Sequence, residues 1–166
     1  MQGKKGPGFD DLRGAGLRPI LALNNLHAEQ TSMLDEVGLA SLIAMACYAR
    51  GTERGATALL IALDQDAGYD NPNFSWLRAR YDRFVYVDRI VVSHRLRGQG
   101  VGRLLYENLF AWTSQAGHNR VVCEVNLRPP NAGSDAFHAA MGFAEIGRAE
   151  ILDGKKSVRY LEKLMP

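Results

Sequence analysis

The stretch from Arg89 to Trp112, RIVVSHRLRGQGVGRLLYENLFAW, joins an apolar strand to an amphipathic helix through a short glycine-rich loop. Glycines stand at alternate positions in this loop, at residues 98, 100 and 102. Arginines flank them at residues 95, 97 and 103. The first turn of a helix presents backbone N–H groups that have no partner within the helix, and glycine lets an anion approach them closely. The stretch therefore predicts a strand, loop and helix unit that binds a phosphate group, and a diphosphate is the ligand that fits it best.

Two common nucleotide motifs fit this spacing poorly. A P-loop needs lysine and then serine or threonine after its last glycine, whereas Arg103 and Leu104 follow here. A dinucleotide fingerprint needs a third glycine at position 103, although Glu124 lies at about the right distance downstream for a ribose contact. This dinucleotide site and a glycine-rich connection without any ligand remain as alternatives, but glycines without a packing reason raise the entropic cost of folding by about 0.5–1 kcal/mol each.

Length and composition predict one enzyme domain. The 166 residues carry 20 basic and 18 acidic side chains, a net charge of +2, so no field of one sign argues for nucleic acid or a membrane surface as a partner. Cys47 and Cys123 form neither a CxxC pair nor part of a histidine cluster, so we expect no disulfide framework and no metal site. We expect a flexible leader over residues 1–16, a single domain over residues 17–166 and a cytoplasmic location.

The apolar periodicity predicts a mixed α/β order with one βαβ crossover near the middle of the sheet. We expect strands over residues 17–25, 55–66, 84–92 and 120–126, helices over residues 27–50 (one or a broken pair), 101–116 and 131–143, and a hairpin over residues 143–165 turned at Asp153-Gly154. Residues 67–83 are expected to form a surface loop. Its four aromatic residues either line an acceptor pocket or form a small satellite core: Tyr69, Phe74, Trp76 and Tyr81.

Two segments resemble a known family. RLRGQGVGRLL resembles the acetyl-coenzyme A loop of the GCN5-related N-acetyltransferase (GNAT) superfamily through Arg97, Gly100 and Gly102. NAGSDAFHAAMGF resembles a second segment of that superfamily, at Asn131, Ser134, Phe137, Gly142 and Phe143. The resemblance covers about residues 84 to 145. It implies an α/β (α+β) fold with a mixed, mostly antiparallel sheet of about six to seven strands, helices on both faces and splayed central strands.

The resemblance also implies where acetyl-coenzyme A binds as co-substrate. The pantetheine arm would pair like an extra strand with the backbone of Ile90, Val91 and Val92. The pyrophosphate would sit on the N–H groups of Arg97, Gly98, Gln99, Gly100, Val101, Gly102 and Arg103. Asn131 and Ser134 would contact the pantetheine or phosphate side, and Phe137 belongs to the same segment.

Three residues are candidates for the chemistry. Transfer of an acetyl group to an amine that titrates near 10 needs a group that takes the amine proton, and Glu124 and Asp88 are the carboxylates on the two central strands. Glu124 resembles the base position of the ribosomal-protein N-terminal acetyltransferases; its alternative is a solvated strand end, and the alternative for Asp88 is an ion pair with a nearby arginine. His138 stands where the superfamily usually has a tyrosine that protonates the departing thiolate, and it serves either as that acid or as packing.

The resemblance and these residues together imply an acetyl-coenzyme A-dependent N-acetyltransferase that works by direct transfer in a ternary complex on an unidentified amine. Cys123 lacks an evident base, so no covalent enzyme intermediate is expected. The alternatives are a module that binds an acyl-coenzyme A without turnover and a domain that binds a protein partner. A homodimer also remains an alternative to a monomer.

Overall fold

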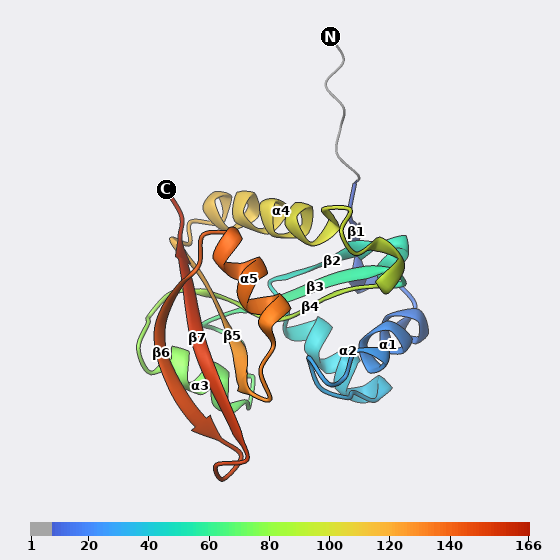
Figure 1. Cartoon of the computed structure of the whole chain (residues 1–166). Helices are drawn as coiled ribbons and strands as arrows, with labels where there is room; N and C mark the ends of the chain where they lie inside the picture. Colours follow the sequence, from blue (N-terminus) through green and yellow to red (C-terminus); the bar gives the residue numbers. More distant parts are fainter. Residues whose placement is uncertain (1–7) are drawn as a thin grey trace. The chain divides into compact units, whose positions relative to one another are not determined.

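The computed structural model describes residues 8–166, which form a mixed α/β fold (Figure 1). The strands are β1 (Asp10–Asp11), β2 (Tyr48–Thr52), β3 (Ala58–Asp64), β4 (Val85–Val92), β5 (Arg120–Arg128), β6 (Ala144–Ile151) and β7 (Lys156–Leu164). The α-helices are α1 (Leu17–Leu26), α2 (Glu36–Met45), α3 (Pro72–Arg78), α4 (Val101–Gln115) and α5 (Ala132–Ala140). Short 3-10 turns lie at η1 (Leu12–Gly14), η2 (Glu53–Gly55) and η3 (His94–Leu96).

The strands belong to one seven-stranded sheet in the order β1-β2-β3-β4-β5-β7-β6. β1 with β2, β2 with β3, β5 with β7, and β6 with β7 are antiparallel, whereas β4 and β5 are parallel. The parallel pair is joined through α4, which is the expected βαβ crossover. The prediction of a mixed, mostly antiparallel sheet of six to seven strands is therefore confirmed.

The chain divides into two compact units. Among the described residues, the first consists of residues 8–62 and 88–109, and the second of residues 63–87 and 110–166. β3, β4 and α4 each contribute residues to both units. The expectation of a single domain over residues 17–166 stays a prediction.

The start of the described chain differs from the expected leader. Asp10 and Asp11 pair with Gly51 and Arg50 of β2, and the side chain of Leu12 is buried with 1% exposed. The leader prediction is therefore wrong from Asp10 onward, because an apolar side chain and an edge strand fix this stretch to the first unit. Residues 1–7 of the expected leader lie outside the described residues.

The first predicted strand, over residues 17–25, is a helix instead. Ile20, Leu23 and Asn24 are buried, and their spacing of three and four residues places them on one face of α1. Pro19 is compatible with this helix because it lies in the first turn, whose N–H groups have no intrahelical partner. The short apolar run looked strand-like because helix and strand cannot be separated by periodicity over so few residues.

The helix predicted over residues 27–50 is correct only in its middle. α2 begins after Asp35, whose carboxylate accepts a hydrogen bond from the Gly38 N–H at 2.7 Å, and it ends at Met45. From Tyr48 onward the chain pairs with β3, with Tyr48 opposite Ala62. The apolar residues beyond α2 are therefore buried in the sheet and not on a helix face.

In the second unit, the predicted surface loop over residues 67–83 contains α3. Asn71 caps this helix by accepting hydrogen bonds from the N–H groups of Asn73 at 2.9 Å and Phe74 at 3.1 Å. Pro72 occupies the first helical position, where its fixed φ angle favours the helix. Phe74 is fully buried and packs edge-on against Phe84 and Tyr86, so for Phe74 the core alternative is correct.

The rest of the second unit follows the predicted order. β5 pairs with β7, and the β6–β7 hairpin turns at Asp153 and Gly154, both of which have positive φ angles. Asp135 of α5 forms an ion pair with Arg159 of β7. Gly147 of β6 makes room for the Trp76 indole, since a Cβ atom there would come within 2.7 Å of the ring. Within residues 8–166, no helix is long and apolar enough to cross a membrane.

Candidate active site

The glycine loop lies in the first unit, between the end of β4 and the start of α4. The chain leaves β4 at Val92, makes the η3 turn and reaches Gly98 and Gly100, which have φ angles of +76° and +78°. These angles lie in the left-handed region that glycine adopts without strain. The N–H of Leu104 donates to the carbonyl oxygen of Gly100 at 3.0 Å, so Gly100 is the residue from which α4 begins. The predicted sequence of strand, glycine loop and helix is confirmed.

Space around the loop fits an approaching anion. A Cβ atom built on Gly98 or on Gly100 would meet no atom within 4 Å. The N–H groups of Val101, Gly102 and Arg103 lie in the first helical turn, where no intrahelical acceptor is available. These N–H groups and the positive end of the helix dipole favour a phosphate. The N–H groups of Arg97 and Gln99 donate to the carbonyl oxygens of His94 and Leu96, so they stabilise the loop itself.

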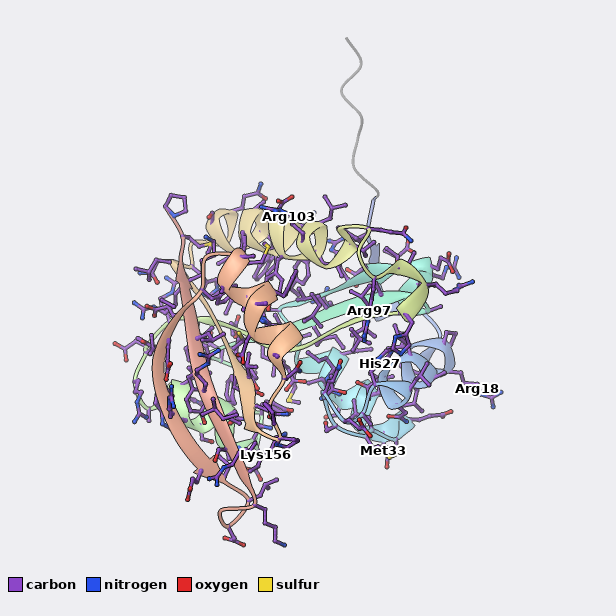
Figure 2. The ribbon with its side chains drawn as sticks, in the orientation of Figure 1. Arg18, His27, Met33, Arg97, Arg103 and Lys156 are labelled. Carbon is purple, nitrogen blue, oxygen red and sulfur yellow. The ribbon has the colours of Figure 1, made fainter. Side chains whose placement is uncertain are left out.

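Arg97 and Arg103 of the loop, both labelled in Figure 2, differ in their contacts. Nη2 of Arg97 lies 3.2 Å from Nδ1 of His27, and Nε of Arg97 donates to the Val92 carbonyl oxygen at 3.4 Å. Arg103 forms an exposed ion pair with Glu107 one helical turn later, at 3.0 Å. Arg97 therefore contacts the end of β4 and the cap of α1, whereas the ion pair of Arg103 is formed with its own helix.

Ile90, Val91 and Val92 form the last part of β4. Val91 is buried, with 4% of its surface exposed, whereas Ile90 and Val92 are partly exposed. The ladder between β4 and β5 pairs Val85 with Val121 and Tyr86 with Val122, at the beginning of β4. Pairing of the pantetheine arm with residues 90–92 stays a prediction.

Asp88 is held in a buried ion pair. Its Oδ2 accepts a hydrogen bond from Nε of Arg89 at 2.7 Å, and the side chains of both residues are 4% exposed. Arg89 also donates to Oδ1 of Asn24 at 2.8 Å and to Oγ of Ser32 at 3.4 Å. These contacts support the structural alternative for Asp88, because a carboxylate engaged with a buried guanidinium is poorly placed to accept a substrate proton.

In the second unit, Glu124 lies at the centre of a hydrogen-bond network. Its Oε1 accepts from Nδ2 of Asn73 at 3.1 Å and from the Tyr86 hydroxyl at 3.0 Å. Asn73 in turn accepts from the hydroxyl of Tyr160 at 2.9 Å. Asn73, Tyr86 and Tyr160 are all buried. Glu124 is therefore not at a solvated strand end, which was the alternative interpretation. Its carboxylate is partly buried and accepts hydrogen bonds from two donors.

Tyr160 reinforces this network. Trp76 stacks on its ring, with centroids 3.9 Å apart and planes inclined by 13°. Burial, and then the charge of Glu124, raise the pKa of Tyr160 to about 12, so its hydroxyl keeps its proton over the working range of an enzyme. The hydroxyl donates to Oδ1 of Asn73, which can only accept, and so orients the amide whose NH2 group donates to Glu124.

His138 is buried on α5, with 4% of its surface exposed. Its Nδ1 lies 2.7 Å from the carbonyl oxygen of Ser134 and 3.2 Å from the hydroxyl of the same residue. A carbonyl oxygen only accepts, so Nδ1 carries the hydrogen, and the neutral ring has an acceptor at Nε2. Burial lowers the pKa of His138 below its ordinary value, although the Ser134 bond and the Asp135 charge act in the opposite direction.

Asn131 and Ser134 have roles within α5. The side chain of Asn131 caps the helix by accepting from the Ser134 N–H at 3.2 Å. Ser134 holds His138, and the ring of Phe137 lies edge-on to the same histidine at a centroid distance of 5.4 Å. The predicted contacts of these residues with acetyl-coenzyme A stay predictions.

Three residues of the Glu124 network were absent from the sequence-based site: Asn73, Tyr86 and Tyr160. Asn73 was missed because residues 67–83 were expected to be a loop, although Asn71 followed by Pro72 is a typical helix start. Tyr86 does have a signal, since a tyrosine in a central strand needs a hydrogen-bond partner for its hydroxyl. No signal in the sequence identifies Tyr160, because its hydrogen bond to Asn73 depends on the pairing of β7 with β5.

Comparison with protein families gives one match. The acetyltransferase (GNAT) family matches residues 68–143, which span α3, β4, the glycine loop, α4, β5 and α5. No curated protein matches the sequence.

Solved structures of acetyltransferases share the fold. The IAA acetyltransferase from Bacillus cereus has a TM-score of 0.61 at 11% identity, over 95% of this chain and 97% of that chain. An acetyltransferase of the GNAT family from Streptococcus pneumoniae has a TM-score of 0.63 at 16% identity, over 89% and 91%. The ribosomal-protein-S18-alanine N-acetyltransferase from Escherichia coli has a TM-score of 0.50 at 16% identity, over 80% and 90%.

Identities this low show the fold alone, whereas the family match rests on the sequence and includes the glycine loop and the α5 segment. Residues 68–143 therefore match the acetyltransferase (GNAT) family, and the chain shares its fold with solved acetyltransferases.

Proposed function

We propose that this chain is an acetyl-coenzyme A-dependent N-acetyltransferase that moves the acetyl group directly to a primary amine in a ternary complex. The glycine loop carries this proposal. Gly98 and Gly100 leave open space beside the first turn of α4, and the N–H groups of Val101, Gly102 and Arg103 give the pyrophosphate of the co-substrate its hydrogen bonds.

Glu124 is the general base in this proposal. An alkyl amine is mostly protonated at neutral pH, and the lone pair that attacks the thioester carbon is available only after a proton has left. Glu124 takes that proton, directly or through one water molecule. Its Oε1 is fixed in place by hydrogen bonds from Asn73 and Tyr86.

The thiolate of coenzyme A leaves as the tetrahedral intermediate collapses. The nitrogen gives up its second proton to the thiolate or to solvent in this step, so the amide nitrogen carries two protons fewer than the ammonium form of the amine. A thiol near pKa 8.5 is a good leaving group, so the step needs little acid assistance. Neutral His138 offers an acceptor at Nε2, so donation from that nitrogen needs the imidazolium, which burial disfavours. These contacts support packing as its role.

We propose no covalent enzyme intermediate, in keeping with a buried Cys123 that is 3% exposed. The acceptor is an amine of a small molecule or of a peptide. The names of the similar structures do not identify the acceptor, because they refer to different acceptors. One is an IAA acetyltransferase and another is a ribosomal-protein-S18-alanine N-acetyltransferase. A cytoplasmic location and a homodimer remain predictions.

The test combines binding with turnover. Acetyl-coenzyme A binding is measured by calorimetry, and thiol release is followed with a panel of alkyl amines, polyamines, amino acids and peptide N-termini. Thiol release with at least one amine, an acetylated product in the mass spectrum and intersecting initial-velocity lines support direct transfer. Tight binding without thiol release from any amine would assign the chain to acyl-coenzyme A binding, and no binding at all would overturn the proposal. Parallel initial-velocity lines would contradict the ternary complex.

A further inference from the structure

His27 touches the glycine loop from outside the family match. It is the C-cap of α1, directly after Leu26, and its side chain is buried with 6% exposed. Its Nδ1 lies 3.2 Å from Nη2 of Arg97, and Figure 2 shows the two residues close together. Both belong to the first unit. Arg97 is the first residue of the glycine loop, so α1 and the loop meet through this contact.

The chemistry of this contact requires a neutral histidine. A guanidinium has donors and no acceptor, so Nδ1 of His27 must accept the hydrogen bond. The hydrogen of the neutral ring is then on Nε2. That atom is buried and has no hydrogen-bond partner within residues 8–166. The fold therefore leaves one polar atom of the ring unsatisfied while it keeps the contact between Nδ1 and Arg97.

The surroundings of His27 oppose its protonation. Burial lowers its pKa below the ordinary value, and the positive charges of Arg97 and then of His94 lower it further. The His94 ring, on the η3 turn, lies 4.9 Å from the His27 ring between centroids. A proton on Nδ1 would remove the acceptor for Arg97 and place two positive charges side by side.

Arg97 has a second anchor at the end of β4. Its Nε donates to the Val92 carbonyl oxygen at 3.4 Å. These two contacts restrict the rotamers of Arg97 before any ligand binds. Ligand binding then costs less side-chain entropy than it would for a freely rotating arginine. A guanidinium held in this way is ready for an anion, and the loop that it belongs to keeps its path between β4 and α4.

We propose that His27 is a positioning residue for the glycine loop. Its neutral imidazole holds Arg97 in the orientation that binds the ligand, and the protonated imidazole does not. The affinity of the protein for acetyl-coenzyme A therefore falls as the pH is lowered. This inference rests on the proposed binding of acetyl-coenzyme A by the loop. His27 itself touches no reacting atom.

Two substitutions of nearly equal size separate the positioning role from simple packing. His27→Asn keeps an oxygen acceptor at the place of Nδ1, and this oxygen does not titrate. His27→Gln moves the amide to the place of Nε2 and loses the acceptor. His118→Gln is the matched control, since His118 is a buried histidine of the second unit whose pKa burial also lowers.

Binding of acetyl-coenzyme A to each full-length variant is measured by calorimetry at pH 7.5 and pH 5.5. The phosphate monoester of the ligand also titrates between these values, near pH 6. That change is common to all variants, so the informative quantity is the ratio of dissociation constants between variants at each pH. Melting curves at both pH values identify any variant that does not fold.

At pH 7.5 we expect His27→Asn to bind like the wild type and His27→Gln to bind about tenfold more weakly, the effect of one lost hydrogen bond. At pH 5.5 the wild type should lose affinity relative to His27→Asn, whereas His118→Gln should follow the wild type throughout. Equal affinities of wild type and His27→Gln at both pH values would overturn the positioning role. Equal pH dependence of wild type and His27→Asn would overturn the link to protonation. Absence of binding by the wild type itself would instead contradict the proposed function.

Discussion

At the scale of single residues, the tautomer of His138 separates its two candidate roles. Because Nδ1 donates to the Ser134 carbonyl oxygen, Nε2 of the neutral ring cannot give a proton to a thiolate. We therefore expect His138→Phe to keep kcat within about twofold of the wild type, as for a site whose ring serves packing. Steady-state kinetics with saturating acetyl-coenzyme A measure this. A drop of tenfold or more in kcat with an unchanged Michaelis constant would restore the acid role.

Glu124 gives the second prediction at this scale. Glu124→Gln should lower kcat/KM for the amine about 100-fold at pH 7, within the range typical of a lost general base. The deficit should shrink as the pH approaches the pKa of the amine, because the free amine then needs no base. A pH–rate profile from pH 6.5 to 9.5 measures both effects.

Glu162→Gln is the matched control for that prediction. Glu162 is a carboxylate of the same unit, partly buried and paired with Arg120 at 2.7 Å, so its loss perturbs charge and burial in a similar way. It should leave the profile unchanged. Tyr86→Phe, which removes one donor to Oε1 of Glu124, should have an intermediate effect. A Glu124→Gln profile that parallels the wild type would remove Glu124 from the mechanism.

At the scale of elements, the start of α4 makes a prediction about the glycine loop. Gly100→Asp should weaken acetyl-coenzyme A binding at least 100-fold, because a carboxylate beside the first helical turn repels the phosphate and blocks its approach. Gly117→Asp is the control, since Gly117 has the same φ angle of +78° at the other end of α4. The control should lose similar stability and keep its affinity. Wild-type affinity in a folded Gly100→Asp variant would contradict the assignment of the loop.

The elements also show how far sequence alone reaches. β3 and β4 are long apolar runs, so their burial in a sheet follows from composition, and the glycine loop follows from spacing. α1 was misread because its buried Asn24 looked like a turn residue, and one of the partners of its side chain, Arg89, is 65 residues away. The Glu124 network could not be predicted either, because it also joins residues that are far apart in the sequence. It depends on the register between β7 and β5 and on the presence of α3.

At the scale of the whole molecule, three buried histidines predict acid sensitivity. Burial lowers the pKa of His27, His118 and His138 below the ordinary value of 6.5. The unfolded chain therefore binds more protons than the folded one as the pH falls below about 6.5, so stability is fully present above that pH and declines below it. We expect a lower Tm at pH 5.5 than at pH 7.5. For a chain of this length, each 1 kcal/mol lost lowers Tm by about 2–4 °C.

Thermal melts between pH 8 and pH 5 measure this slope, in a window above the ordinary titration of aspartate and glutamate. His118→Gln removes one of the three groups and should flatten the slope, even if its Tm at pH 7.5 is lower. A Tm that is constant or rises from pH 7.5 to pH 5.5 would contradict the prediction, as would an unchanged slope in His118→Gln.

The hydrogen bond between Asn73 and Tyr160 has a further consequence, for synthesis. It joins residues 87 positions apart, whereas the bond from Asn73 to Glu124 joins residues 51 positions apart. A nascent chain on the ribosome can form α3 and the β4 strand long before Tyr160 has been translated. Until then the Asn73 amide lacks the hydroxyl that orients it toward Glu124. The proposed base is therefore assembled late, and a partly translated chain holds the glycine loop without the complete carboxylate network.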